Sequence, residues 1–92
     1  MSMNVHIYAN RQVRFNTPNG EMTDTQSNRF ACWQTPTTDS YRIQDSGDPI
    51  LAYRKWVENR ANTEIAAGHL RELDEWTARM EAAGYTIELE VW

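Results

Sequence analysis

The sequence is poor in the residues that build disulfides and metal sites. Its 92 residues include one cysteine, Cys32, and two histidines, His6 and His69. A single cysteine excludes a disulfide within the chain, and neither histidine has a second ligand at a metal-binding spacing, so we expect no metal. The sequence also lacks a signal peptide and any apolar run near the roughly 20 residues that span a bilayer. We therefore expect a cytoplasmic protein with no cofactor and no membrane contact.

The sequence also lacks residue motifs that would indicate a particular reaction. The glycines form no phosphate-binding loop, and Cys32 lies in an apolar run beside Trp33, where thiols usually serve as inert packing. Glu88 and Glu90 stand about 7 Å apart on one strand face, as paired hydrolase carboxylates can, but acids on a terminal strand are more often solvated. We expect a non-enzymatic protein without catalytic residues. The alternative is a small hydrolase or metal-dependent enzyme centred on His6, Cys32 or the two glutamates.

Tryptophan, in contrast, is abundant. Average usage would place roughly one in a chain of this length, and this chain has four: Trp33, Trp56, Trp76 and Trp92. We expect one domain, residues 1–92, which buries only about three fifths to two thirds of its unfolded surface. Large aromatic side chains then supply much of the core, and we expect Trp56 and Trp76 to be core anchors on two neighbouring helices.

Charge is divided unevenly along the chain. The net charge is -4, but residues 1–44 carry +1 and residues 45–92 carry -5, with ten acidic and five basic groups. A protein that grips nucleic-acid phosphates is expected to show a basic stripe instead. The balance therefore favours a protein partner with a basic surface over direct contact with nucleic acid.

Alternation of apolar and polar side chains marks the N-terminal half. It covers residues 3–9 and continues at Val13 and Phe15, which predicts one or two strands, and Thr17-Pro18-Asn19-Gly20 predicts a chain reversal. Four further expectations concern the following segments: a loop or weak edge strand over 21–28, a strand over 29–33, an interruption at Thr35-Pro36-Thr37, and a short strand over 40–44 with Tyr41 and Ile43 on one face.

Capping signals mark two helices in the second half. Asp48 can cap a helix that starts at Pro49. That helix either breaks within 59–63, with Asn62 capping a second helix, or runs on to Gly68. We favour the break, which makes a helical hairpin.

The last residues have the most regular pattern of all. Gly84 is expected to end the second helix, after which Tyr85, Ile87, Leu89 and Val91 alternate with polar residues as in a half-buried strand. The predicted fold is α+β: a two-layer sandwich with an antiparallel sheet of four or five strands, the helical hairpin on one face and the C-terminal strand returning to the sheet.

Trp92 is the candidate anchor for a partner. Strand alternation places it with Glu88 and Glu90, opposite the apolar side chains, so we expect it to face solvent. Tryptophan is enriched among residues that dominate binding energy. The same edge can equally serve a homodimer.

Acidic and basic side chains suggest two further binding surfaces. Glu72, Asp74 and Glu75 on the second helix can extend the field of Glu88 and Glu90 toward a basic partner, or can simply be solvated. An alternative is a candidate basic patch in the N-terminal sheet, made of Arg11, Arg14 and Arg29.

A single-domain acidic chain of about ninety residues, with a short sheet, a helical hairpin and no catalytic motif, resembles the small accessory proteins of bacteriophages, in particular phage-encoded anti-CRISPR proteins. The resemblance is one of size, charge and architecture and assigns a role to no residue. It implies an inhibitor that binds an RNA-guided interference complex and blocks DNA recognition or nuclease recruitment. An immunity protein or a structural phage component is a further alternative.

Overall fold

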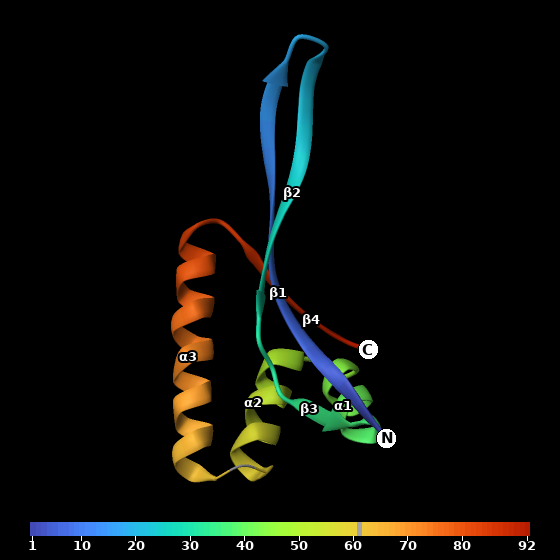
Figure 1. The fold of residues 1–92 in the computed structure, drawn as a ribbon, viewed down its shortest axis with the longest axis vertical. Helices are drawn as coiled ribbons and strands as arrows, with labels where there is room; N and C mark the ends of the chain where they lie inside the picture. Colours follow the sequence, from blue (N-terminus) through green and yellow to red (C-terminus); the bar gives the residue numbers. More distant parts are fainter. Residues whose placement is uncertain (61) are drawn as a thin grey trace.

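A computed structural model describes residues 1–60 and 62–92 and confirms the α+β class (Figure 1). Two long strands, β1 (Ser2–Thr17) and β2 (Gly20–Phe30), form an antiparallel hairpin. The predicted reversal at 17–20 is confirmed. Gly20 has a φ of 116°, a value that suits glycine, and the Thr17 hydroxyl donates to the Gly20 carbonyl at 2.8 Å.

β1 is the central strand of the sheet. On one side it pairs with β2 and, through its first residues, with the short strand β3 (Gln34–Pro36); on the other it pairs with β4 (Thr86–Val91). All pairings are antiparallel. The predicted return of the C-terminal strand to the sheet is confirmed, and Trp92 extends it by exchanging backbone hydrogen bonds with Asn4 at 2.8 and 3.1 Å.

Three helices complete the fold: α1 (Thr37–Gln44), α2 (Pro49–Arg60) and α3 (Thr63–Ala82). The helical hairpin of α2 and α3 begins as the caps predict. Asp48 accepts from the Leu51 amide at 3.2 Å, and Asn62 accepts from the Glu64 amide at 3.0 Å. Gly84, with a φ of 86°, follows α3 and lets the chain turn toward β4.

The segment between β2 and α2 departs from the sequence prediction. The strand expected over 29–33 ends at Phe30, the interruption at 35–37 is instead β3 leading into α1, and the strand expected over 40–44 is helical. Pro36 serves as the N-cap residue of α1, where its missing amide costs nothing. Ile43 is buried while Tyr41 is 49% exposed, so the two do not share a face as a strand would require.

Residues 21–28, for which the sequence left a loop or a weak edge strand open, form an edge strand. They belong to β2, which is longer than its polar composition suggests. Every residue from Gly20 to Arg29 is exposed. A strand is recognised in a sequence from apolar residues at every second position. A polar segment with no buried face lacks this signal. Backbone pairing with β1 holds this strand instead.

The core lies between one face of the sheet and the three helices. β1 supplies Val5, Ile7 and Ala9, and the helices supply Ile43, Tyr53, Val57, Ala66, Leu70, Leu73 and Trp76. The expectation that Trp56 and Trp76 anchor the core is confirmed, with Trp76 buried and Trp56 half-buried against it. No helix within the described residues is long and apolar enough to cross a bilayer.

Beyond the core, the hairpin of β1 and β2 projects from the body (Figure 1). We call residues 11–26 the arm. The molecule measures 54 × 26 × 20 Å along its principal axes, and the arm accounts for its length. Near the tip, Phe15 and Met22 are cross-strand partners and are 44% and 52% exposed.

Candidate protein-binding face

The helices cover one face of the sheet and leave the other open. Along β1, Val5, Ile7 and Ala9 point into the core, so the alternate residues His6 and Tyr8 point to the opposite side. The same alternation applies to β4. We call the side chains on this side, around the central part of β1, the outer face: His6, Tyr8, Arg29, Glu88, Glu90 and Trp92.

Three aromatic rings form a cluster on the outer face. The rings of His6 and Trp92 stack with centroids 3.5 Å apart and planes 11° apart, and Tyr8 lies 6.0 Å from His6 and 5.9 Å from Trp92 in nearly the same orientation. Trp92 is nonetheless 54% exposed, as its strand position predicts. A terminal residue usually frays, but the backbone bonds to Asn4 and the stack on His6 hold this indole in place.

Charges of opposite sign lie beside the aromatic cluster. Glu88 and Glu90 lie on β4, cross-strand from Tyr8 and His6, and the Asn10 amide donates to a Glu88 carboxylate oxygen at 3.3 Å. Arg29 lies on the other side of β1, cross-strand from Tyr8. Across the strands, the outer face therefore runs from Arg29 on β2, over His6 and Tyr8 on β1, to the two carboxylates and Trp92 on the β4 side.

His6 is the least exposed member of the outer face. Its exposed fraction is 7%, and its Nε2 atom has no hydrogen-bond partner among the described residues. Burial is the main cause that lowers the pKa of His6; the positive charge of Arg29 adds to it and the carboxylate of Glu90 opposes it. The imidazole is therefore neutral at pH 7.

The predicted acidic residues fall into two separate groups. Glu88 and Glu90 belong to the outer face, whereas Glu72, Asp74 and Glu75 are exposed on α3, in the helical layer behind the sheet. Asp74 forms an ion pair with Arg54 of α2. Only the β4 pair shares a surface with Trp92.

The three arginines of the candidate basic patch are not brought together. Arg11 reaches the end of α3: it donates to the Ala83 carbonyl at 2.9 Å, and its guanidinium lies 4.7 Å from the centre of the Tyr85 ring. Arg14 pairs with Glu21 on the arm at 3.7 Å. Arg29 alone joins the outer face, so the three arginines of the candidate basic patch have different surroundings.

A second polar cluster lies among the helices. The Tyr53 hydroxyl accepts from the Trp33 amide at 3.2 Å and contacts His69 Nε2 at 2.7 Å, and the Trp33 ring stacks on His69 with centroids 4.6 Å apart. Burial raises the pKa of Cys32 to about 11, so its thiol stays protonated at neutral pH. Burial also lowers the pKa of His69, which Glu72 partly offsets. The side chains of this cluster therefore serve to pack the interior of the protein.

Sequence reasoning found Trp92 and its two glutamates but missed His6 and Tyr8 as parts of the same face. The signal was present, because both alternate with Val5, Ile7 and Ala9. The sequence pattern does not give the strand register, which places His6 opposite Glu90. No group of three or more His, Cys, Asp or Glu side chains suited to a metal ion occurs in the described part of the chain.

Comparisons with protein-family models, with curated proteins and with solved structures find no match to this chain.

Proposed function

We propose that this chain is a non-enzymatic binding protein whose outer face takes a basic segment of a protein partner. The observation that carries the proposal is the rigid, half-exposed Trp92, which is stacked on His6 beside Glu88 and Glu90. An aromatic side chain already held in one position loses little entropy on binding. Adjacent carboxylates favour lysine or arginine over the same ring, where a cation–π contact and an ion pair can form together.

The identity of the partner class is part of the same proposal. The resemblance to phage anti-CRISPR proteins indicates an RNA-guided interference complex, which holds nucleic acid in channels lined with basic side chains. Occupying such a channel blocks DNA recognition or nuclease recruitment. The carboxylates of β4 rather than those of α3 make this contact, because only they adjoin Trp92.

The test is a competition between the two acidic groups. A purified interference complex, with labelled target DNA as the readout, and a panel of arginine-rich peptides are titrated with the wild-type protein, W92A, E88K/E90K and the matched control E72K/E75K. We expect W92A and E88K/E90K to weaken binding at least tenfold, as for an interface hot spot, and the control to bind like wild type.

Two results would overturn parts of this proposal. If E72K/E75K loses binding while E88K/E90K keeps it, the acidic face of α3 is the binding surface. If no complex or peptide binds the wild-type protein, the outer face is not a docking site for basic partners.

A further inference from the structure

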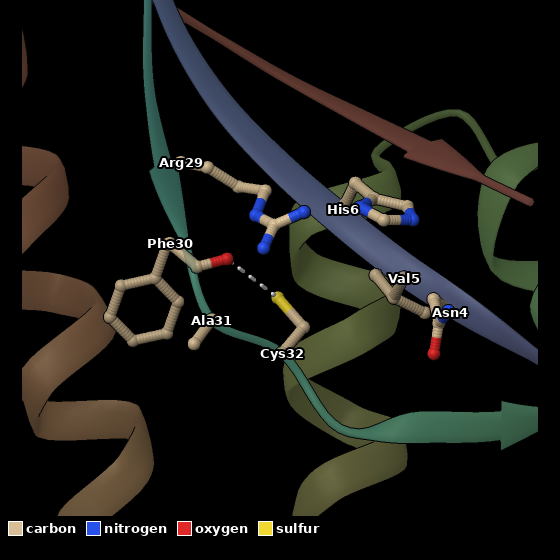
Figure 2. A pocket seen from close by; sticks show the side chains of 7 residues that line it. All are labelled: Asn4, Val5, His6, Arg29, Phe30, Ala31 and Cys32. Carbon is tan, nitrogen blue, oxygen red and sulfur yellow. Dashed lines mark hydrogen bonds between the residues drawn. The ribbon is translucent and has the colours of Figure 1, made fainter.

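β4 forms the edge of the sheet on the side away from β2. Figure 2 shows β1 with β2 on one side and β4 on the other. Within the described residues, β4 pairs with β1 and with no further strand. A strand at the edge of a sheet presents unpaired N–H and C=O groups to any extended segment that can pair with them.

The register with β1 determines which backbone groups β4 presents. Along an antiparallel strand, successive residues direct their backbone hydrogen bonds to opposite sides. Trp92 exchanges both of its bonds with Asn4, and the register runs unbroken along β4 from there, so every second residue before Trp92 also bonds to β1. The residues between them direct their N–H and C=O groups outward: Ile87, Leu89 and Val91.

The hydrogen bond of Val91 confirms this direction. Its N–H donates to the side chain of Gln44, on α1, at 2.9 Å. In contrast, no hydrogen bond within the described residues engages the N–H or C=O groups of Ile87 and Leu89. α1 therefore caps the edge at Val91 and leaves two donors and two acceptors open before it.

On the helix side of the sheet, the apolar side chains of β4 are covered incompletely. Ile87 and Leu89 are half-buried against the core, whereas their cross-strand partners on β1, Ala9 and Ile7, are completely buried. The central strand has neighbours on both sides and β4 has a neighbour on one, which accounts for the difference. Apolar side chains of an added strand would cover this part of the core.

On the outer face, the same edge carries charge of one sign. Glu88 and Glu90 are exposed, and neither forms an ion pair within the described part of the chain. The cation of this face, Arg29, lies on β2 and extends toward His6 (Figure 2), so β1 and β4 separate β2 from an added strand. In any antiparallel register that pairs Leu89 with an outward residue of a second β4, a glutamate would face a glutamate. Like charges opposite each other destabilise a strand pair, so the edge favours a basic strand over a second copy of itself.

The free edge of β2 is less suited to such a strand. Its residues from Gly20 to Arg29 are all exposed, so a strand added there would cover no part of the core. It also carries charges of both signs, from Glu21, Asp24 and Arg29. Of these two edges, the edge of β4 alone combines half-buried apolar side chains with carboxylates.

We propose that the basic segment of the partner binds as a β-strand added to the edge of β4, with lysine or arginine alternating with apolar residues. The inference rests on the proposed function and specifies the conformation and the sequence pattern of the ligand. Backbone hydrogen bonds to Ile87 and Leu89 supply affinity, and the alternate side chains supply specificity. Apolar residues opposite Ile87 and Leu89 cover the core, while the basic residues between them face Glu88 and Glu90.

The experiment titrates the ¹⁵N-labelled full chain with the peptide acetyl-TKVRVKT-amide, followed by NMR, and with two N-methylated forms of that peptide. One form carries methyl groups on both valine nitrogens, and the matched form carries them on the first two basic residues. An antiparallel strand turns the valine N–H groups toward β4, so valine methylation should weaken binding about tenfold or more and the matched form less than about threefold. A parallel strand reverses the two effects. Either selectivity supports strand addition, and equal effects of the two forms overturn it.

Amide hydrogen exchange provides a second measurement on the unmodified protein. In the free chain, the amides of Ile87 and Leu89 should exchange faster than those of Glu88 and Glu90, which donate to β1. Saturating peptide should slow exchange at Ile87 and Leu89 about tenfold or more. If the peptide binds without protecting these two amides, strand addition is overturned.

The outcomes separate this inference from the proposed function. If arginine-rich peptides bind but the alternating peptide does not, or if bound peptide leaves Ile87 and Leu89 unprotected, strand addition fails and the proposed function stands. If no basic peptide and no complex binds the wild-type chain, the proposed function fails and strand addition fails with it.

Discussion

β1 passes through two different environments with one continuous set of backbone pairs. Its first half crosses the body, where Val5, Ile7 and Ala9 are almost completely buried under the helices. Its second half enters the arm, where Phe15 is 44% exposed although the pairing with β2 runs unbroken from Ile7 to Thr17. The ladder is the same in both halves, so packing against helices, not strand pairing, makes the first half the core.

The comparison also bears on function. A two-stranded ribbon without a covered face is at best marginally stable alone in water. In the arm, cross-strand contacts such as the Arg11–Gln26 hydrogen bond and the Arg14–Glu21 pair supplement the ladder, and each is exposed. The body therefore provides most of the stability of the fold, and the arm depends on its attachment to the body.

The largest expected effect sharpens this contrast directly. Ile7→Ala removes a completely buried side chain and should lower the free energy of unfolding by about 2–5 kcal/mol. Phe15→Ala on the arm should lower it by less than about 1 kcal/mol, although phenylalanine is the larger residue. Urea denaturation followed by tryptophan fluorescence measures both. Equal losses would show that the arm is part of the cooperative core.

Thiol reactivity provides the second contrast. The raised pKa of Cys32, about 11 against an ordinary 9.0, should make alkylation at pH 8 about a hundredfold slower than for an exposed cysteine, from the thiolate fraction alone. The reference is T25C on the arm, introduced into a C32A background. Iodoacetamide labelling followed by mass spectrometry gives both rates. Comparable rates in the native proteins would mean that the thiol of Cys32 is not protected.

The pH dependence of stability should originate in the body. His6 and His69 both have pKa values lowered from 6.5 by burial, so as pH falls the unfolded chain takes up protons first. Stability is therefore fully present above about pH 7 and declines as pH falls from 6.5 through the lower folded pKa values. Urea midpoints between pH 8 and 5, at fixed salt, test this sign. A midpoint that rises over this range as pH falls would contradict it.

The smallest effect is expected from shortening the arm. Arg11 and Gln26 are cross-strand partners, so Asn-Gly can replace residues 12–25 as a tight turn between them. The body should keep its near-ultraviolet circular dichroism, and the free energy of unfolding should change by less than about 1 kcal/mol. The pH profile should also be retained, since both histidines remain. Loss of the cooperative transition would show that the body needs the arm.

Local signals predicted those elements whose own residues carry the pattern. The turn at 17–20, the caps at Asp48 and Asn62, and the alternation before Trp92 each depend on neighbouring residues, and each is confirmed. The strand predicted over 40–44 was wrong because it was based on two apolar residues, Tyr41 and Ile43. Two residues are too few to distinguish the two-residue period of a strand from one turn of a helix. The pairing that places Pro36 at the end of an edge strand involves residues more than thirty positions away.

By itself, the sequence determined the α+β class, the helical hairpin, the C-terminal strand and the exposure of Trp92, because these follow from short-range periodicity and capping chemistry. Tertiary structure alone decided that His6 stacks on Trp92, that Arg29 and not Arg11 or Arg14 lies beside them, and that the acids of β4 and α3 occupy separate surfaces. These outcomes depend on strand register and on which sheet face the helices cover. Both are set by the burial of apolar side chains from all parts of the chain together. No local sequence pattern records that burial.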